Sequence, residues 1–447
     1  MNRDSIDFAS TSIPVLFRKM FIPTLLGMLS VAALTAIDGI FVGQGVGAAG
    51  LASVNIVAPL FMVFTGLGLM LGVGCSVVAS IHLSESNVKA ARLNVTQALL
   101  VATLIGVVIC MPVVAAPGIV GRLMGGSEAL MPQVEQYALG LVPGLILGVW
   151  TSIGLFVIRL DGSPAFAMWV NVVAAVINIG LDWVCIFPLG MGVFGAAVAT
   201  SASIAVSGGI VILYLTRFAR TLRLCRVKLS VKSMLLTLRN IGYQCKIGFS
   251  ALLGEFTLAI FMYMGNLVFM EYVGDDGVGA FAIACYYLPF IFMFGNAVAQ
   301  SAQPIISYNM TTQPWRAAAV QRYAIYTAIV CGLSIAAVFA LFPGQLVALF
   351  LDADNPSARM AVAGLPVYAT GFVFFVLNLT CIGYYQSVER ILPATVYALL
   401  RGAVFLVPSF LIVPRLFGVA GIWLSMPVAE FATLAVIVAV YVLTKKA

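Results

Sequence analysis

The stretch "GAAGLASVNIVAPLF", residues Gly47–Phe61, returns in altered form as "GVGAFAIACYYLPFI", residues Gly277–Ile291. The alignment pairs Gly47 with Gly277 and Pro59 with Pro289. Further along, "PGIVGRLMGG" from Pro117 matches "PGQLVALFLD" from Pro343. Self-similarity at a long, fixed separation indicates an internal structural repeat. The sequence therefore predicts two halves of the same architecture.

Composition places both halves in a membrane. Of the 447 residues, 62% are hydrophobic and only 9% are charged, which is far from the usual composition of a soluble domain. A membrane-spanning helix needs about 20 mostly apolar residues, and such runs recur along the whole chain. We expect twelve of them, at 20–44, 49–82, 95–116, 133–160, 164–187, 193–216, 243–272, 278–310, 322–342, 358–386, 392–413 and 417–443.

The expected fold is an all-α polytopic membrane protein with two six-helix lobes. Because six is an even number, the two lobes would be parallel repeats, related by a pseudo-two-fold axis normal to the membrane. We expect an N-lobe at residues 1–216, a basic linker at 217–240 and a C-lobe at 241–447. Repeats of this kind are typical of transporters in which two lobes rock around a central site.

The distribution of Lys and Arg predicts the orientation. Most of the basic residues fall near the two termini, in the linker "RFARTLRLCRVKLSVKSMLLTLRN" and in the loops on that same side. The positive-inside rule therefore predicts that both termini and the linker are cytoplasmic, in the plasma (inner) membrane. We attribute the net charge of +7 to this topology and to contact with anionic membrane lipids, and we exclude nucleic acid as a partner.

Several classes of chemistry lack the residues they require. The eight cysteines include no CxxC pair, and His82 is the only histidine, so a redox site or a resident metal centre is not expected. The phosphate-binding pattern GxxxxGK[ST] is absent, which excludes direct use of ATP by that loop. We expect no cofactor and no enzymatic activity.

Five charged residues lie deep within apolar runs, where each costs at least roughly 2.5–3.5 kcal/mol. Two of them, Arg401 and Glu430, lie at similar distances from a turn near Arg415 and so share a depth. We predict that they form a structural ion pair, with a role in transport as the alternative. Glu255 stands alone in its helix, where it either contacts the substrate or a second cation, or is satisfied by a neighbouring polar group.

Four oxygen-bearing residues of the N-lobe form the candidate coupling site. Asn178 and Asp182 are four residues apart and share a helix face, and Thr200 lies opposite Asp182 across a hairpin. Asp38 lies at a similar distance from the outer end of its own helix. Such a set suits Na⁺, or a carboxylate pair that shares a proton. The alternative is an interhelical hydrogen-bond cluster that only holds the helices together.

The chain as a whole resembles the multidrug and toxic compound extrusion (MATE) family, in particular its DinF-like branch. The resemblance implies that Asp38, Asn178, Asp182 and Thr200 hold H⁺ or Na⁺, and that Pro23 is the point at which the first helix bends. The NorM-like branch carries a second carboxylate cluster in its C-lobe. Here Glu255 matches one half of that cluster, while the tenth helix, "PVYATGFVFFVLNLTCIGYY", carries no carboxylate.

The expected function is secondary antiport, with export of amphipathic, cationic organic compounds in exchange for H⁺ or Na⁺. The coupling ion would be the only metal bound, and small organic molecules and membrane lipids would be the partners of a monomer. A lipid-linked oligosaccharide flippase of the same superfamily is the alternative, although Arg401 is the only intramembrane arginine available for pyrophosphate-linked cargo. An intramembrane enzyme would need a nucleophile–base or metal constellation, which a single histidine does not supply.

Overall fold

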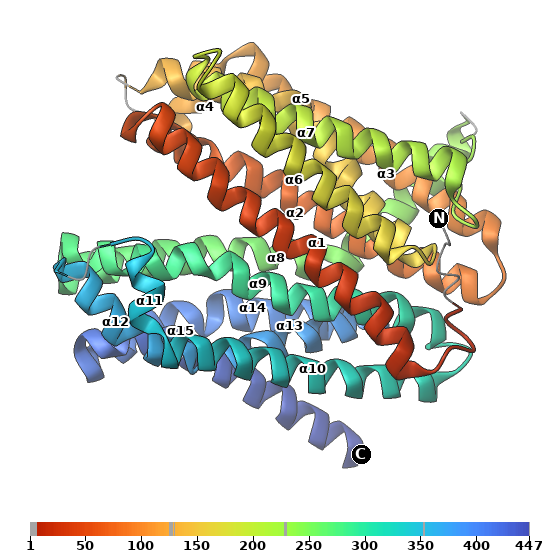
Figure 1. Ribbon diagram of the computed structural model, residues 1–447. Coiled ribbons are helices and arrows are strands. Elements are labelled where there is room, and N and C mark those ends of the chain that lie inside the picture. The colour runs from red at the N-terminus through yellow and green to blue at the C-terminus, as the bar shows by residue number, and fades with distance from the viewer. Residues whose placement is uncertain (1–6, 125–127, 129, 228–229, 352–353, 447) are drawn as a thin grey trace. The chain divides into compact units, whose positions relative to one another are not determined.

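All regular secondary structure is helical in the part that the computed structural model describes, residues 7–124, 128, 130–227, 230–351 and 354–446 (Figure 1). By its packing the chain forms two units. Unit 1 comprises Met1–Gly248 with Ser307–Gln313, and unit 2 comprises Phe249–Ile306 with Pro314–Ala447.

The first half of the chain contributes nine helices up to the start of unit 2. They are α1 (Ile13–Gly45), α2 (Ala48–Ser84), α3 (Val88–Ala115), α4 (Pro117–Leu123), α5 (Met131–Leu160), α6 (Pro164–Ile186), α7 (Gly192–Leu213), the π-helical segment η1 (Tyr214–Phe218) and α8 (Val231–Tyr272), among the described residues.

The second half continues from α8 with helices of more varied length. They are α9 (Asp275–Asn309), α10 (Pro314–Leu341), α11 (Pro343–Ala348), α12 (Pro356–Ala369), α13 (Phe372–Ser387), α14 (Ile391–Leu399), the π-helical segment η2 (Leu400–Val404) and α15 (Leu406–Lys446).

Length and hydropathy divide these helices into twelve membrane spans, as predicted. Among the described residues, nine single helices are long and apolar enough to cross a bilayer, and α12 with α13 forms a tenth span bent by 47°. The remaining apolar segment, Ile391–Leu443, has 53 residues, or roughly 80 Å of helix against about 30 Å of hydrocarbon. It is divided at Gly418, whose φ of 59° and ψ of −141° are not helical, so it supplies the last two spans.

Helix boundaries differ from the prediction where a helix continues beyond its apolar run. The predicted linker 217–240 is helical from Val231 onward, because α8 begins there and not at residue 243. Helix α3 likewise begins at Val88, seven residues early, where the Asn87 side chain caps it by accepting a hydrogen bond from the Ala90 N–H at 3.2 Å. The predicted positions of both chain ends concern residues outside the described range.

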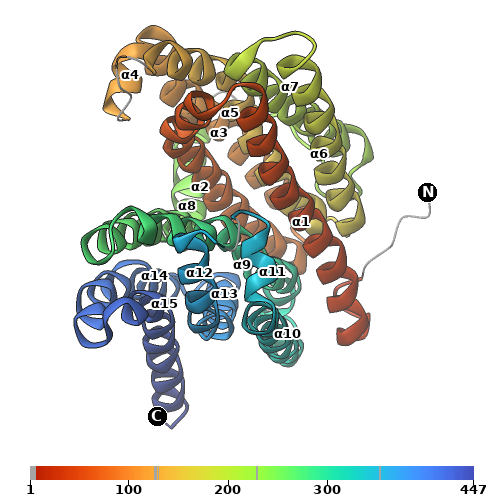
Figure 2. The ribbon, with the colours of Figure 1, turned by 60° about the vertical axis from the view of Figure 1, so that its left-hand side comes forward.

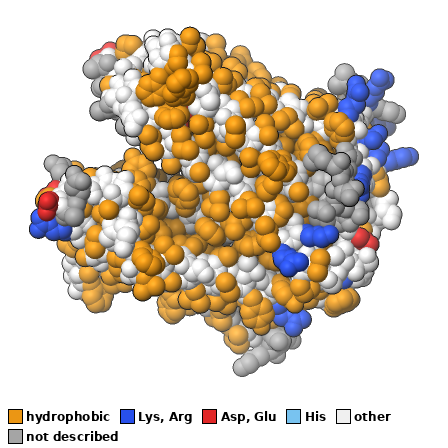
Figure 3. Space-filling view, viewed as in Figure 1, with side chains coloured by type: hydrophobic (Ala, Val, Ile, Leu, Met, Phe, Trp, Pro, Cys, Tyr) orange, Lys and Arg blue, Asp and Glu red, His pale blue; other side chains and the backbone are white. Residues whose placement is uncertain are grey.

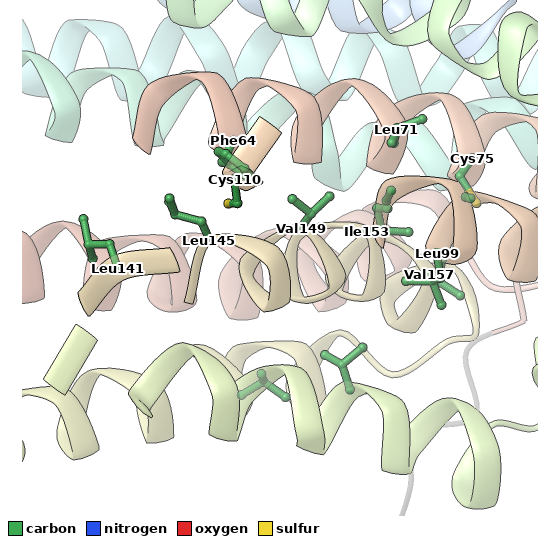
Figure 4. Close-up of a cluster of buried hydrophobic side chains, with 14 of the residues drawn as sticks. Phe64, Leu71, Cys75, Leu99, Cys110, Leu141, Leu145, Val149, Ile153 and Val157 are labelled. Carbon is green, nitrogen blue, oxygen red and sulfur yellow. The ribbon is translucent and has the colours of Figure 1, made fainter. Parts of the chain in front are cut away.

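The core of unit 1 lies among α2, α3 and α5 (Figure 4). Phe64 and Leu71 of α2 meet Leu145, Val149 and Ile153 of α5, and all five are buried. Helices α5 and α7 approach more closely still. The Ser201 hydroxyl donates to the Gly140 carbonyl oxygen at 2.6 Å, which is possible because glycine and serine leave room for the two backbones.

The core of unit 2 is aromatic. Phe261 and Phe281 have ring centroids 5.1 Å apart, and Phe269 lies 5.1 Å from Trp423 on α15. Tyr368 of α12 packs edge-on against Phe372 at 5.0 Å. These rings join α8, α9, α12, α13 and α15 within unit 2.

Candidate coupling site and buried ion pair

Helices α1 and α6 run side by side and parallel, which fixes the level of Asp38 (Figures 1 and 2). A Cβ added at Gly27 would lie 3.2 Å from the Met168 Cα, and one added at Gly45 would meet the Ile186 side chain. Residue 27 thus faces residue 168 and residue 45 faces residue 186. The same offset places Asp38 opposite residue 179, between Asn178 and Asp182.

The two carboxylates come together at this level. The side chains of Asp38 and Asp182 lie within hydrogen-bonding reach of each other. Asp182 is fully buried and Asn178 is 2% exposed, while Asp38 is half-buried. The structure therefore joins Asp38 on α1 to Asp182 on α6, with Asn178 one turn away on the same helix.

Most polar atoms of this group lack a partner. Asp38 Oδ1, both carboxylate oxygens of Asp182 and the Nδ2 of Asn178 make no hydrogen bond with any described residue. Neither carboxylate forms an ion pair within the described part of the chain. Two neighbouring carboxylates repel each other when both are ionised, so one of them takes a proton or both share a cation. Unpartnered oxygens of this kind fit either ligand.

Thr200 lies at the same depth but is not joined to the carboxylates. In the α6–α7 hairpin, a Cβ added at Gly195 would lie 3.0 Å from the Cys185 Cβ, which places Thr200 level with Gly180. Thr200 is half-buried, and its hydroxyl makes no hydrogen bond to the described residues. Helix α7 therefore lies beside the carboxylates, but the Thr200 hydroxyl is not bonded to them.

Tyr137 is a neighbour that the sequence reasoning missed. It is 6% exposed on α5, within electrostatic reach of both Asp38 and Asp182. A phenol can donate to a carboxylate and accept from a proton donor, so it suits the edge of such a site. Nothing in "PQVEQYALG" signalled this, because the position of Tyr137 depends on how α5 packs against the other helices.

Pro23 lies inside α1, which runs unbroken from Ile13 to Gly45. Proline has no N–H, so the Lys19 carbonyl loses its usual helical partner at this turn. The next residue, Thr24, is 1% exposed, and its hydroxyl oxygen has no hydrogen-bond partner among the described residues. The first helix thus carries a weakened turn in a buried position, about four turns before Asp38.

Glu255 lies apart from this group, on the portion of α8 that belongs to unit 2. It is partly exposed and forms no ion pair with a described residue. No hydrogen bond or ion pair joins Glu255 to the described residues, and its predicted contact with substrate or a second cation stays a prediction.

Arg401 and Glu430 meet inside unit 2. Arg401 Nε donates to Glu430 Oε1 at 2.7 Å, and the two side chains are 2% and 3% exposed. Asn378 Nδ2 donates to the second carboxylate oxygen at 2.7 Å and to the Glu430 carbonyl at 2.8 Å. The guanidinium carbon lies 4.1 Å from the centroid of the Phe375 ring. Asn378 lies in the tenth predicted helix, which carries no carboxylate, and its amide group binds Glu430.

Comparisons with known proteins agree with this architecture. The family model described as MatE matches residues 23–184 and again residues 251–411, once in each half of the chain. Among curated proteins, the multidrug export protein MepA of Staphylococcus saprophyticus is 25% identical over 406 residues, which cover 88% of this chain and 86% of that protein. MepA of Staphylococcus aureus is 22% identical over 404 residues, with the same coverage.

Solved structures share the fold. A MOP superfamily transporter from Pyrococcus furiosus has a TM-score of 0.85 at 22% identity, over 96% of this chain and 95% of that one. A variant of the Vibrio cholerae MATE transporter VcmN has a TM-score of 0.88 at 19% identity, over 97% and 98% of the two chains.

Proposed function

Since this chain belongs to the MatE family of membrane transporters, we propose that it is a secondary antiporter in which Asp38 and Asp182 carry the coupling ion. It would export amphipathic, cationic organic compounds in exchange for H⁺ or Na⁺. The names of its MepA relatives, which are multidrug export proteins, support multidrug efflux.

The observation that carries the proposal is the buried pair of carboxylates. Asp182 is fully buried, and its oxygens and one of those of Asp38 have no partner among the described residues. A cluster that served only to hold helices together would pair its donors with its acceptors. Instead, three carboxylate oxygens of this group have no hydrogen-bond partner among the described residues, which is an arrangement that a proton or a small cation can complete.

The coupling step follows from electrostatics. With both carboxylates ionised, α1 and α6 carry like charges at one level, and their repulsion favours separation at that level. A bound proton or Na⁺ removes that repulsion and favours close approach. An ion can shift α1 between a straight and a bent shape only if it binds one of the two shapes more tightly than the other. Pro23 supplies the weakened turn at which α1 can bend.

The finer assignment is to the DinF-like branch. The residues that support it are Asp38, Asn178, Asp182 and Thr200 in unit 1, with Asn378 in place of a carboxylate in unit 2. We also propose a monomer in the plasma membrane, with both termini on the cytoplasmic side.

The test is ion-driven export in proteoliposomes. Purified protein would be reconstituted with a fluorescent cationic dye, and a pH gradient and a sodium gradient would be imposed separately. We expect one of the two gradients to drive dye movement, and Asp182→Asn to abolish it. The surface variant Asp354→Asn, which removes one exposed carboxylate, is the matched control. Dye movement that does not depend on either gradient, or that continues at the wild-type rate in Asp182→Asn, would contradict the proposal.

A further inference from the structure

The first part of α8, Val231–Gln244, exposes an apolar stripe. Val231, Met234, Leu235 and Leu238 are 73%, 65%, 62% and 63% exposed. Their spacing of three and four residues places them on one face of the helix. Four large apolar side chains in a row are rarely left in water on a soluble surface, so this face has a partner.

The opposite face is polar and already bound within unit 1. Gln97 of α3 donates to the Thr237 hydroxyl at 2.8 Å and accepts from Asn240 Nδ2 at 2.9 Å. Gln244 Nε2 donates to Asn94 Oδ1 at 3.0 Å. Both glutamines are fully buried. The helix therefore turns its polar side to the protein and its apolar side outward, the reverse of a helix on a soluble protein.

These bonds also show the direction of the segment. Along α8 the contacts run from Thr237 to Gln244, while along α3 they run back from Gln97 to Asn94. Seven residues of α8 thus correspond to three of α3, so α8 crosses α3 obliquely at this point. The crossing lies within two turns of Arg92, near the predicted cytoplasmic end of α3. With 42 residues, or roughly 63 Å, α8 is also about twice as long as a membrane span requires.

Basic side chains flank the stripe. Lys232, Arg239 and Lys246 are exposed and seven residues apart, so they form one ridge beside the apolar face. The linker supplies further exposed arginines, at positions 220, 223 and 226. Basic side chains gather at one end of the molecule in the view of Figure 3.

The linker is held at the same crossing by two anchors. The Asp161 carboxylate accepts from the backbone N–H groups of Arg220, Thr221 and Leu222 at 2.9, 2.9 and 3.1 Å. Arg92 Nε donates to the Thr221 carbonyl at 2.6 Å. The Asp161 carboxylate therefore binds the backbone of the linker and forms no ion pair with the described arginines of the linker. The side chains of these arginines remain exposed.

We propose that residues 231–246 form an interfacial helix that binds anionic phospholipid. The acyl chains would cover Val231, Met234, Leu235 and Leu238, while Lys232, Arg239 and Lys246 would hold the phosphate headgroup. An amphipathic helix with apolar and basic faces side by side is the form that lies at the boundary of headgroups and acyl chains. An anionic lipid satisfies both faces at once, whereas an acidic soluble partner would leave the apolar stripe in water.

The test measures lipid affinity of the purified full-length protein by native mass spectrometry. Phosphatidylglycerol and phosphatidylcholine would be titrated separately. We expect the wild type to prefer phosphatidylglycerol, and Lys232→Gln with Arg239→Gln to weaken that binding about fivefold for each charge removed. The control, Arg322→Gln with Arg390→Gln, removes the same charge from exposed positions of unit 2 outside the proposed lipid site, so it should weaken the binding clearly less than Lys232→Gln with Arg239→Gln does.

A second measurement tests the apolar face. Leu235→Ser with Leu238→Ser should lower the midpoint of thermal unfolding in nanodiscs that contain phosphatidylglycerol, because serine is poorly suited to the acyl region. If the stripe faced water, the same change would leave the midpoint unaltered, and the proposal would be wrong. Equal affinity of the wild type for both lipids, or an equal loss in the control variant, would also overturn it.

Discussion

The buried acidic residues differ in what each carboxylate meets at its own position. Glu430 has a cation at one oxygen and an amide at the other, so its charge is neutralised within the protein. Asp38 and Asp182 lie within reach of each other and of Tyr137, and neither forms an ion pair with a described residue. An unpaired buried carboxylate is costly, and such residues in membrane helices mark ion and proton pathways. This contrast separates a structural charge from one that is available to an exchangeable ion.

The first prediction concerns that exchangeable charge. Asp38→Asn and Asp182→Asn keep the shape of the side chain but remove the group that ionises, so each should reduce ion-driven dye export to the level of empty liposomes. Neither should lower the thermal unfolding midpoint, because the asparagine removes a repulsion. Export at the wild-type rate in either variant would show that coupling lies elsewhere.

The second prediction concerns the neutralised charge. Arg401→Ala leaves Glu430 buried without its cation, and Glu430→Ala leaves Arg401 without its anion, so each single change should cost about 3–5 kcal/mol of stability. The double variant should be milder than either, because no unpaired charge remains. The measurement is a double-mutant cycle on thermal unfolding, and additive losses would mean that the two residues do not stabilise each other.

Residues of these sites could be predicted where a single helix or hairpin placed them, or, for Asp38, from its distance to the end of its own helix. Asn178 and Asp182 follow from the helical period, and Arg401 and Glu430 from equal distance to one turn. Tyr137 and Asn378 come from helices remote in the sequence, and only packing brings them to the carboxylates. Both are residue types that occur throughout membrane helices, so their identity alone carried no signal.

At the scale of single elements, α1 combines a weak turn and a functional carboxylate in one helix. The third prediction is that Pro23→Ala restores the missing backbone hydrogen bond and stiffens α1, which should slow dye turnover. Equilibrium binding of the dye should change less than turnover. Unchanged turnover would show that the proline is only architectural and that α1 does not need to bend.

Two glycines set the distance between α2 and α8 within unit 1. A Cβ at Gly74 would lie 2.6 Å from the Gln244 carbonyl carbon, and one at Gly248 would lie 2.7 Å from that of Met70. Real side-chain atoms do not approach a neighbouring backbone this closely. The two helices can therefore touch at these points only because both positions are glycine.

The fourth prediction uses this contact. Gly74→Ala should lower the thermal unfolding midpoint, by the equivalent of about 1–3 kcal/mol, because the backbones must separate. Gly209→Ala is the matched control on α7, where a Cβ would meet nothing within 4 Å. That change should leave the midpoint unaltered or raise it, since alanine favours a helix by up to about 1 kcal/mol. Equal effects of the two changes would contradict the close approach.

The sequence predicted which segments form helices better than it predicted where those helices begin and end. All twelve apolar runs are helical, because only a helix satisfies its backbone groups inside a bilayer. The ends at Val88 and Val231 could not be found from hydropathy, since those turns are polar on one side. The extra turns are stabilised by caps and by side-chain bonds such as that of Gln97 to Thr237, which depend on a neighbouring helix.

For the whole molecule, antiport implies reversibility. The fifth prediction is that inverting the driving ion gradient inverts the direction of dye movement, because a coupled exchange follows the larger of the two gradients. ATP added without a gradient should have no effect. The measurement is dye flux in proteoliposomes with the gradient imposed in each direction, and movement in one direction only under both gradients would show that the protein is not an exchanger.

The two-part organisation could be predicted because the repeat is visible in the sequence, and the MatE model matches each half once. The division by packing was not visible. Ser307–Gln313 belongs to unit 1 although it follows the first helices of the second half. Its attachment depends on the hydroxyls of Ser80 and Ser84, which bond Ser307 and Thr311, and on Asn309, which donates to the Phe8 carbonyl oxygen at 3.1 Å.

That attachment orders the events of synthesis. A ribosome adds roughly 5–20 residues each second and releases the N-terminal part first. The first 248 residues of the chain are therefore synthesised several seconds before Ser307–Gln313. During that interval the Ser80 hydroxyl lacks its hydrogen-bond partner Ser307, which has not yet been synthesised. Unit 1 is thus incomplete until α9 and the four residues that follow it, up to Gln313, have been translated.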